Sequence, residues 1–320
     1  MSNLNDVYRS VEPELLQVEA EMGRTVQTVC PRLADAATYF LERSGKRIRP
    51  LITILTAKLG QAEKDIVVKV AAALELIHLG SLVHDDIVDE AELRRGRPSV
   101  NSYFGNTSAV LLGDFFFARA LGLASEVGLE AVRVVSSVIG NLVEGELDQL
   151  ERRFDPEVTV DDYFARIKRK TALFLAECCR MGGLFSAGNP LSPDHLYAYG
   201  LNLGLAFQVK DDLLDFSGQV DRLGKPVMRD LSQGVITLPV IHALEHHPRR
   251  EEISAWIRSQ RVDSWAQIRQ CLEESGSLQY AEQRACQLIE HAKRQLDGVP
   301  EQAAKAALLH LADFVLSRVS

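Results

Sequence analysis

Apolar residues recur along this 320-residue chain mainly at the three- and four-residue spacing of α-helices, without a convincing series of alternating strands. Segments such as Val67–Leu79 are apolar around most of their circumference, which is typical of a helix at the centre of a bundle. Turn residues interrupt the pattern at Gly60, Gly96-Arg97-Pro98, Asp155-Pro156 and Gly188-Asn189-Pro190. The sequence therefore predicts an all-α protein, a large bundle of roughly a dozen helices with two of them buried centrally.

The chain contains no Pro-, Ser- or Gly-rich stretch that would separate two domains. We therefore predict a single all-helical domain over residues 1–320. Five shorter helices are expected between Val235 and Arg318. The other expected helices cover about 10–29, 31–43, 47–60, 65–90, 106–125, 127–152, 160–185 and 192–217.

Composition excludes several classes of protein. The formal net charge of -8 argues against a general nucleic-acid binder, which normally presents a basic face. The five cysteines form no CxxC pair and no zinc-type cluster, so they indicate buried thiols in a reducing cytoplasm. The start of the chain lacks the regions of a signal peptide, and no apolar run approaches the roughly 18 residues of a spanning helix. We expect a cytoplasmic protein without stable membrane insertion.

Two similar acidic runs carry the chemical information: His84–Asp89 and Lys210–Asp215. Each places carboxylates at positions i, i+1 and i+4 near the end of a long predicted helix. The helix dipole is negative there and disfavours each carboxylate by roughly 0.3–1 kcal/mol. The six carboxylates are those of Asp85, Asp86, Asp89, Asp211, Asp212 and Asp215.

A solvated helix end explains most acidic pairs, but here the DDxxD pattern occurs twice, on helices with apolar bodies, and the first copy is followed by basic residues. Six carboxylates that converge on one cavity would repel one another unless cations lay between them. Oxygen ligands select hard cations, and sparse carboxylates that leave room for water and phosphate suit Mg²⁺ better than a closed Ca²⁺ cage. The pattern predicts a diphosphate held through bridging metal ions.

Basic and polar residues extend this prediction. Lys46 and Arg49 share a face beside a helix N-terminus, which favours anions, although a solvated basic turn would look the same. His78 lies two turns before Asp85 on the same stripe, and Gln208 lies one turn before Asp212. A lone histidine on an apolar helix is more often a core residue, and only the shared stripe favours a functional role. Further cations and a hydroxyl come from Lys170-Thr171 and Lys225.

Together these residues resemble the trans-polyprenyl diphosphate synthase family over nearly the whole chain. The resemblance implies an all-α prenyl synthase fold, usually homodimeric, with a deep central cavity between helices. The ordered motifs that carry it are SGKRIRP (44–50), ELIHLGSLVHDDIVDEAELRRGRP (75–98), KTA (170–172), LGLAFQVKDDLLDFSG (203–218) and GKPVMRDLSQGVITLP (224–239). Ser44 stands where the family commonly has glycine, and Val235 where a polar or basic residue is common.

The resemblance also implies the roles of the residues. Isopentenyl diphosphate would be bound by Lys46, Arg49, His78 and Arg95. The six aspartates would hold Mg²⁺, three ions per site with substrate bound, on an allylic diphosphate. Arg94, Lys170 and Lys225 would contact that diphosphate directly, and Thr171 and Gln208 would line the reacting carbon. The implied reaction is ionisation of the allylic diphosphate, attack by the alkene of isopentenyl diphosphate, and loss of a proton.

Product length would depend on the helix that carries Asp85. Relatives that make short products tend to have aromatic residues at the positions of Gly80 and Ser81, whereas both are small here, with Ile77 further down. The resemblance then implies a path open past the first turn and a product of roughly six to ten isoprene units (about C30–C50), as for a quinone side chain. The alternative is that these small residues only permit close helix packing.

Other interpretations stay open. A short-chain farnesyl or geranylgeranyl diphosphate synthase differs only in product length. The segment Glu75–Pro98 resembles the catalytic subunit of two-component heptaprenyl diphosphate synthases, so a small dissimilar partner subunit is a further expectation beside the homodimer. A class I terpene cyclase would not need Lys46, Arg49, His78 and Arg95, and a non-catalytic subunit would commonly lose an acidic motif. A ferritin-like metal bundle would need Glu-x-x-His pairs near the clusters, and the sequence has none there.

Overall fold

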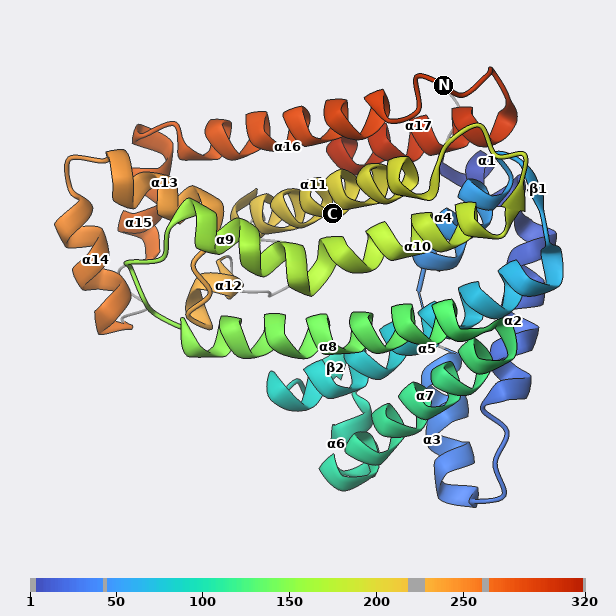
Figure 1. Ribbon diagram of the computed structural model, residues 1–320. Coiled ribbons are helices and arrows are strands. Elements are labelled where there is room, and N and C mark those ends of the chain that lie inside the picture. Colours follow the sequence, from blue (N-terminus) through green and yellow to red (C-terminus); the bar gives the residue numbers. More distant parts are fainter. Residues whose placement is uncertain (1–3, 43–44, 218–227, 261–264, 319–320) are drawn as a thin grey trace. The chain divides into compact units, whose positions relative to one another are not determined.

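The computed structural model describes residues 4–42, 45–217, 228–260 and 265–318 (Figure 1). These residues are predominantly helical, and their strands are two antiparallel pairs of two-residue segments, β1 (Gln61–Ala62) with β4 (Ser186–Ala187) and β2 (Leu93–Arg94) with β3 (Arg97–Pro98). The predicted all-α class is thereby confirmed.

The long helices lie close to their predicted limits. The prediction of five helices after Val235 also agrees with the described residues, whereas α1 (Leu4–Arg9), α6 (Val100–Phe104) and α12 (Arg229–Ser232) were not predicted. The predicted elements are α2 (Glu12–Thr25), α3 (Pro31–Leu41), α4 (Ile48–Ala57), α5 (Lys64–Val88), α7 (Asn106–Val127), α8 (Leu129–Glu151), α11 (Pro193–Ser217), α13 (Leu238–His246), α14 (Arg250–Ser259), α15 (Trp265–Glu274), α16 (Ser277–Arg294) and α17 (Ala303–Ser317).

One predicted helix differs from the structure. The segment expected to form a single helix over 160–185 is instead α9 (Val160–Ile167), a π-helical turn η1 (Lys168–Ala172) and α10 (Leu173–Leu184). A π turn inserts one extra residue into a helix and re-aims the side chains that it carries. The turn contains no glycine or proline, the residues that usually mark a helix break in a sequence.

The chain divides into two compact units. Unit 1 comprises Met1–Gly140, Glu177–Tyr197 and Gly298–Leu308, and unit 2 comprises Asn141–Ala176, Ala198–Asp297 and Leu309–Ser320. Each unit has its own buried side chains and is described separately. The single domain over residues 1–320 stays a prediction.

The core of unit 1 is built around α5, which packs against α2, α4 and α7 (Figure 1). Its residues from Val70 to Ile77 are all buried, as predicted for a helix that is apolar on every side. Small residues let α5 and α7 approach closely. The ring of Phe117 on α7 occupies the space beside Gly80, and His84 on α5 occupies the space beside Gly113.

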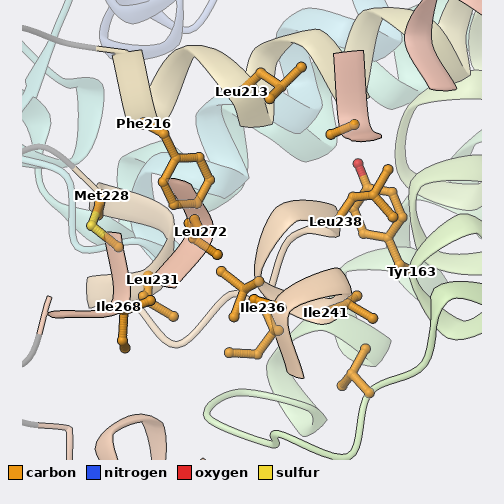
Figure 2. Close-up of a cluster of buried hydrophobic side chains, with 14 of the residues drawn as sticks. Tyr163, Leu213, Phe216, Met228, Leu231, Ile236, Leu238, Ile241, Ile268 and Leu272 are labelled. Atoms are coloured by element: carbon orange, nitrogen blue, oxygen red, sulfur yellow. The ribbon is translucent and has the colours of Figure 1, made fainter. Parts of the chain in front are cut away.

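The core of unit 2 is a cluster of aliphatic and aromatic side chains from α9, α11, α13, α15 and α16. Figure 2 shows Phe216, Ile236 and Leu272 within it, with Tyr163 and Leu238 at one side. Ile236 and Leu238 are fully buried and lie directly before and at the start of α13. This packing fixes the ends of α9 and α11, which carry polar residues of the candidate site.

Within the described residues, α5 and α7 are long and apolar enough by length and composition to cross a membrane. The apolar stretch of α5 is 72% buried inside the protein, as expected of a core helix. That of α7 is only 39% buried, so this helix keeps an apolar face outside the core of unit 1.

Candidate functional site

The first acidic cluster lies at the C-terminal end of α5 in unit 1. Asp86 is only 2% exposed, and its Oδ2 accepts a hydrogen bond from Nε of Arg94 at 2.7 Å. Arg94 belongs to the hairpin of β2 and β3, whose turn residues Arg95 and Gly96 both have positive φ, 53° and 76°. A two-residue turn with two positive φ angles matches the twist of a hairpin. The turn thereby brings two predicted substrate-binding arginines back to the end of α5.

A group of cations surrounds His78, one of the residues predicted to bind isopentenyl diphosphate. The guanidinium of Arg95 lies against Gly45, where an added Cβ would be only 2.2 Å from one of its nitrogens. Arg49 is half-buried, and burial lowers its pKa. Burial, and then the charges of Arg49, Arg94 and Arg95, hold the pKa of His78 well below its usual value. His78 is therefore a neutral imidazole that can donate a hydrogen bond among fixed positive charges.

Glu75 lies among these cations, and the sequence analysis assigned it no role. Its side chain is 3% exposed and pairs with NH1 of Arg47 at 3.1 Å, while its Oε2 has no hydrogen-bond partner within the described residues. Arg47 has a left-handed backbone, with φ of 47°, directly before α4. A non-glycine residue persists there only when its surroundings fix it. The Glu75–Arg47 pair thus holds the backbone between Lys46 and Arg49 in place.

The second acidic cluster lies near the end of α11 in unit 2. Asp212 is 4% exposed, and both of its oxygens accept hydrogen bonds: Oδ2 from the hydroxyl of Tyr163 at 2.7 Å and Oδ1 from Nε2 of Gln208 at 2.8 Å. Gln208 in turn accepts a hydrogen bond from the hydroxyl of Thr171 at 2.8 Å. Predicted residues Thr171, Gln208 and Asp212 therefore form one hydrogen-bonded chain, which Tyr163 terminates.

The other two aspartates of this cluster have different partners. Asp215 accepts hydrogen bonds from the backbone N–H groups of Arg229 and Asp230, each at 3.0 Å, at the start of α12. Asp211 pairs with Arg318 at 2.7 Å. Burial raises the pKa of Asp211 to about 6 and raises the pKa values of Asp212 and Asp215.

Asp230 is a further carboxylate of this cluster that sequence reasoning missed. It belongs to no DDxxD motif, yet its charge interacts with those of Asp212 and Asp215. Burial, together with these two carboxylates, raises its pKa to about 7. A signal was present in the sequence, because Asp230 lies in the family-like stretch 224–239.

These carboxylates fit a hard divalent cation. Four of them lie in unit 2. Burial raises the pKa of each, and repulsion from a neighbouring carboxylate adds to this effect at Asp211, Asp212 and Asp230. A bound cation would remove that repulsion, and oxygen-only donors match the preference of Mg²⁺. Hydrogen bonds do not exclude Asp212 and Asp215 as ligands, because each carboxylate oxygen has two lone pairs.

Lys170 and Thr171 lie on the π turn η1. The ammonium of Lys170 is held by Glu146 at 2.5 Å and by Oε1 of Gln149 at 3.2 Å. It also interacts with the charge of Asp230. The other predicted allylic-site cation of this unit, Lys225, lies outside the described residues, as does Ser44.

The residues predicted to set product length differ in their surroundings. A Cβ on Gly80 would lie 2.7 Å from the ring of Phe117 and 3.1 Å from the carbonyl oxygen of Gly113. The space at Gly80 is therefore filled by α7, and close helix packing accounts for this glycine. Ile77 is fully buried, whereas Ser81 is half-buried and donates a hydrogen bond to the carbonyl of His78. The expectation of an open path now rests on Ser81.

The four isopentenyl-site residues and the first three aspartates lie in unit 1, and the π turn and the other three aspartates lie in unit 2. That the two groups converge on one cavity stays a prediction. Val235 donates its backbone N–H to the carbonyl of Asp230 at 2.8 Å, a contact that does not depend on its side chain.

Asp230→Asn should stabilise the metal-free protein at pH 8. With a pKa of about 7, folded Asp230 keeps a proton between about pH 4 and 7 that the unfolded chain has released. Its ionisation above pH 7 therefore destabilises the fold, and the amide removes that cost. We expect the free energy of unfolding of the variant to exceed that of the wild type by roughly 1–4 kcal/mol at pH 8, and the difference to shrink as the pH falls towards 5.

Urea unfolding of both proteins in the presence of a chelator measures this difference. Asp35→Asn, at an exposed position within α3, is the matched control and should show no such pH-dependent gain. A gain of equal size at pH 5 and pH 8 would contradict the assignment of a raised pKa to Asp230.

Comparisons with known proteins identify the family of this chain. The Polyprenyl synthetase family matches residues 30–275. Heptaprenyl diphosphate synthase component 2 of Geobacillus stearothermophilus is 36% identical over 98% of this chain and 99% of that protein. The crystal structure of a decaprenyl diphosphate synthase from Rhodobacter capsulatus covers 99% of this chain and 100% of that one, with a TM-score of 0.92 and 29% identity.

A polyprenyl synthase from Caulobacter crescentus, whose crystal structure is complexed with calcium and isoprenyl diphosphate, is 33% identical with a TM-score of 0.91 and covers 99% of this chain and 98% of that one. The family match spans both units and more than half of the chain. The chain therefore belongs to the polyprenyl synthetase family: it has the prenyl synthase fold and is a prenyltransferase of the trans-polyprenyl diphosphate synthase type.

Proposed function

We propose that this enzyme condenses isopentenyl diphosphate head-to-tail with an allylic prenyl diphosphate, in a Mg²⁺-dependent reaction that releases diphosphate. The product would be a long all-trans polyprenyl diphosphate of roughly six to ten isoprene units, suited to a quinone side chain. The short-chain alternative, a farnesyl or geranylgeranyl diphosphate synthase, differs from this proposal only in where elongation stops.

The cation group around His78 is the observation that carries this proposal. It places Arg49, Arg95 and neutral His78 together in the same unit as the first acidic cluster. A terpene cyclase needs one allylic diphosphate and has no use for a second, metal-independent anion site. A cluster of cations that does not depend on a metal ion supports a second diphosphate substrate, and thereby condensation.

The chain's own residues have distinct tasks in this reaction. Lys170 and Arg94 neutralise charge that builds up on the leaving diphosphate, which is stabilisation directed at the transition state. Thr171 and Gln208 present oxygen atoms, fixed by their shared hydrogen bond, to developing positive charge on the allylic carbon. Mg²⁺, held by the aspartates, three ions per site with substrate bound, would supply further charge neutralisation on that diphosphate. The calcium in the Caulobacter structure supports a divalent-cation site in this family.

A product assay tests the proposed function. The purified chain would receive isopentenyl diphosphate with Mg²⁺ or with a chelator, and in parallel C5, C10, C15 or C20 allylic primers, and the products would be identified by mass spectrometry. We expect a Mg²⁺-dependent ladder that ends at one long diphosphate. A stop at C15 or C20 would contradict the long product, and cyclic hydrocarbon without elongation would support a cyclase.

Ser81→Phe should shorten the product. Ser81 lies one turn before Asp85 on α5, and an aromatic ring there would meet a chain that grows along this stripe. We expect the main product to lose at least two isoprene units, with turnover of short primers retained. Ser125→Phe is the control, because Ser125 makes the same hydrogen bond to the carbonyl three residues earlier but is exposed on α7. An unchanged product from Ser81→Phe would refute a growth path along Ser81.

We also propose that the enzyme is a cytoplasmic homodimer that uses the apolar face of α7. Leu111 is 59% exposed on this helix, and Val110 and Leu121 add 42% and 37% exposed side chains. A second copy of the chain would bury these residues. The name of the Geobacillus relative, component 2, supports a small second subunit as the other candidate partner.

Leu111→Glu should weaken the dimer by at least about tenfold, because a buried carboxylate would lie in an apolar interface. Light scattering coupled to size exclusion measures the mass, which for a dimer is twice the 35.5 kDa of one chain. Leu16→Glu on α2 is the control, since Leu16 is also 59% exposed. If the wild type runs as one chain, or if both variants remain dimeric, the α7 interface is wrong.

A further inference from the structure

The π turn η1 is bordered by a glycine on each of two neighbouring helices of unit 2. A Cβ on Gly145 of α8 would lie 2.9 Å from the backbone nitrogen of Lys170. A Cβ on Gly204 of α11 would lie 2.6 Å from Cα of Ala172 and 3.3 Å from its carbonyl oxygen. In both cases the atom met is backbone, which cannot move aside as a flexible side chain can.

Both glycines are buried within long helices, where alanine would be the better helix former. A π turn is wider than an α turn, since it contains one extra residue. The absence of two side chains provides the room that this wider backbone occupies. Gly140, five residues earlier on α8, shows the contrast, because within the described chain a Cβ there would meet nothing within 4 Å.

The same two helices also hold the side chains of the turn. The ammonium of Lys170 is bound by Glu146 and Gln149, which follow Gly145 on α8 by one residue and by one turn. One turn after Gly204 on α11 is Gln208, which accepts the hydrogen bond from Thr171. Each glycine therefore sets the backbone distance across which a polar contact is made one turn further along.

We propose that Gly145 and Gly204 are positioning residues for the reaction. They let the π turn pack closely against α8 and α11, so that Lys170 and Thr171 are held in the positions from which they act on the substrate. The proposal rests on the roles assigned to Lys170 and Thr171 in the proposed function. A methyl group at either position displaces the turn by several tenths of an ångström and separates Lys170 from Glu146, or Thr171 from Gln208. Displacements of this size at a reacting group lower rates strongly.

Steady-state kinetics with a C15 allylic primer test the proposal in Gly145→Ala and Gly204→Ala. We expect kcat/KM for the allylic substrate to fall by about tenfold or more, with KM for isopentenyl diphosphate within about twofold of the wild type. Gly140→Ala is the matched control and should keep wild-type kinetics. A general loss of folding would instead lower the melting temperature and impair both substrates equally, and that result would overturn the positioning role.

A double-mutant cycle asks whether the glycines act through Lys170. If they do, Gly145→Ala in a Lys170→Met background should reduce kcat/KM by less than about twofold beyond Lys170→Met alone. Fully additive losses would mean that Gly145 acts elsewhere. A normal allylic kcat/KM in Lys170→Met alone would refute the role of Lys170 in the proposed function. This result distinguishes a failure of the proposed function from a failure of the positioning role of Gly145.

Lysine acylation provides a readout that does not depend on activity. In the wild type the ammonium of Lys170 is held by Glu146 and Gln149. Release from these partners should increase the rate at which Lys170 reacts with acetic anhydride several-fold. Quantitative mass spectrometry after labelling of the intact folded enzyme measures this rate. We expect this increase in Gly145→Ala and not in Gly140→Ala, with Lys305, which pairs with Glu301, as the internal reference. An unchanged rate at Lys170 in Gly145→Ala would overturn the proposal.

Discussion

The carboxylate of Asp212 lies in a buried position, where burial disfavours its charged form. It is 4% exposed, and burial raises its pKa, while hydrogen bonds from Tyr163 and Gln208 act in the opposite direction. An unpaired carboxylate in such a place would take up a proton, so these two donors keep Asp212 able to meet a cation. Asp230 has a raised pKa as well, because of its burial first and then the charges of Asp212 and Asp215. The carboxylates of unit 2 therefore repel one another, and a bound divalent cation would relieve that repulsion.

In unit 1 the roles are exchanged: a buried carboxylate stabilises a neighbouring cation against the effect of burial. Burial lowers the pKa of Arg49, and the charge of Glu75 acts against that effect. Glu75 also holds Arg47 in its left-handed conformation before α4. A single buried carboxylate thus opposes the effect of burial on Arg49, pairs with Arg47 and fixes the backbone between them. An incoming diphosphate would find its binding groups already ordered, which reduces the entropy lost on binding.

The sequence predicted those parts of the fold and site that depend on local pattern. Helix limits follow from periodicity and turn residues, and the DDxxD runs are visible because they are repeated. Tyr163 escaped prediction because its partner Asp212 is 49 residues away, and nothing in the local sequence distinguishes it from a core tyrosine. Glu75 looked like one polar residue on an apolar helix until Arg47, 28 residues earlier, was placed against it. Contacts at such separations require the tertiary structure.

Glycines illustrate why a small residue alone does not reveal its function. Gly80 and Gly204 are both buried in long helices beside an acidic motif, and the sequence gives no reason to treat them differently. At Gly80 the neighbour is the ring of Phe117, a side chain that fills the space a longer residue would need. At Gly204 the neighbour is the backbone of Ala172, one residue after Thr171. The first glycine therefore permits close packing of α5 against α7, whereas the second permits close approach of α11 to the backbone of the π turn.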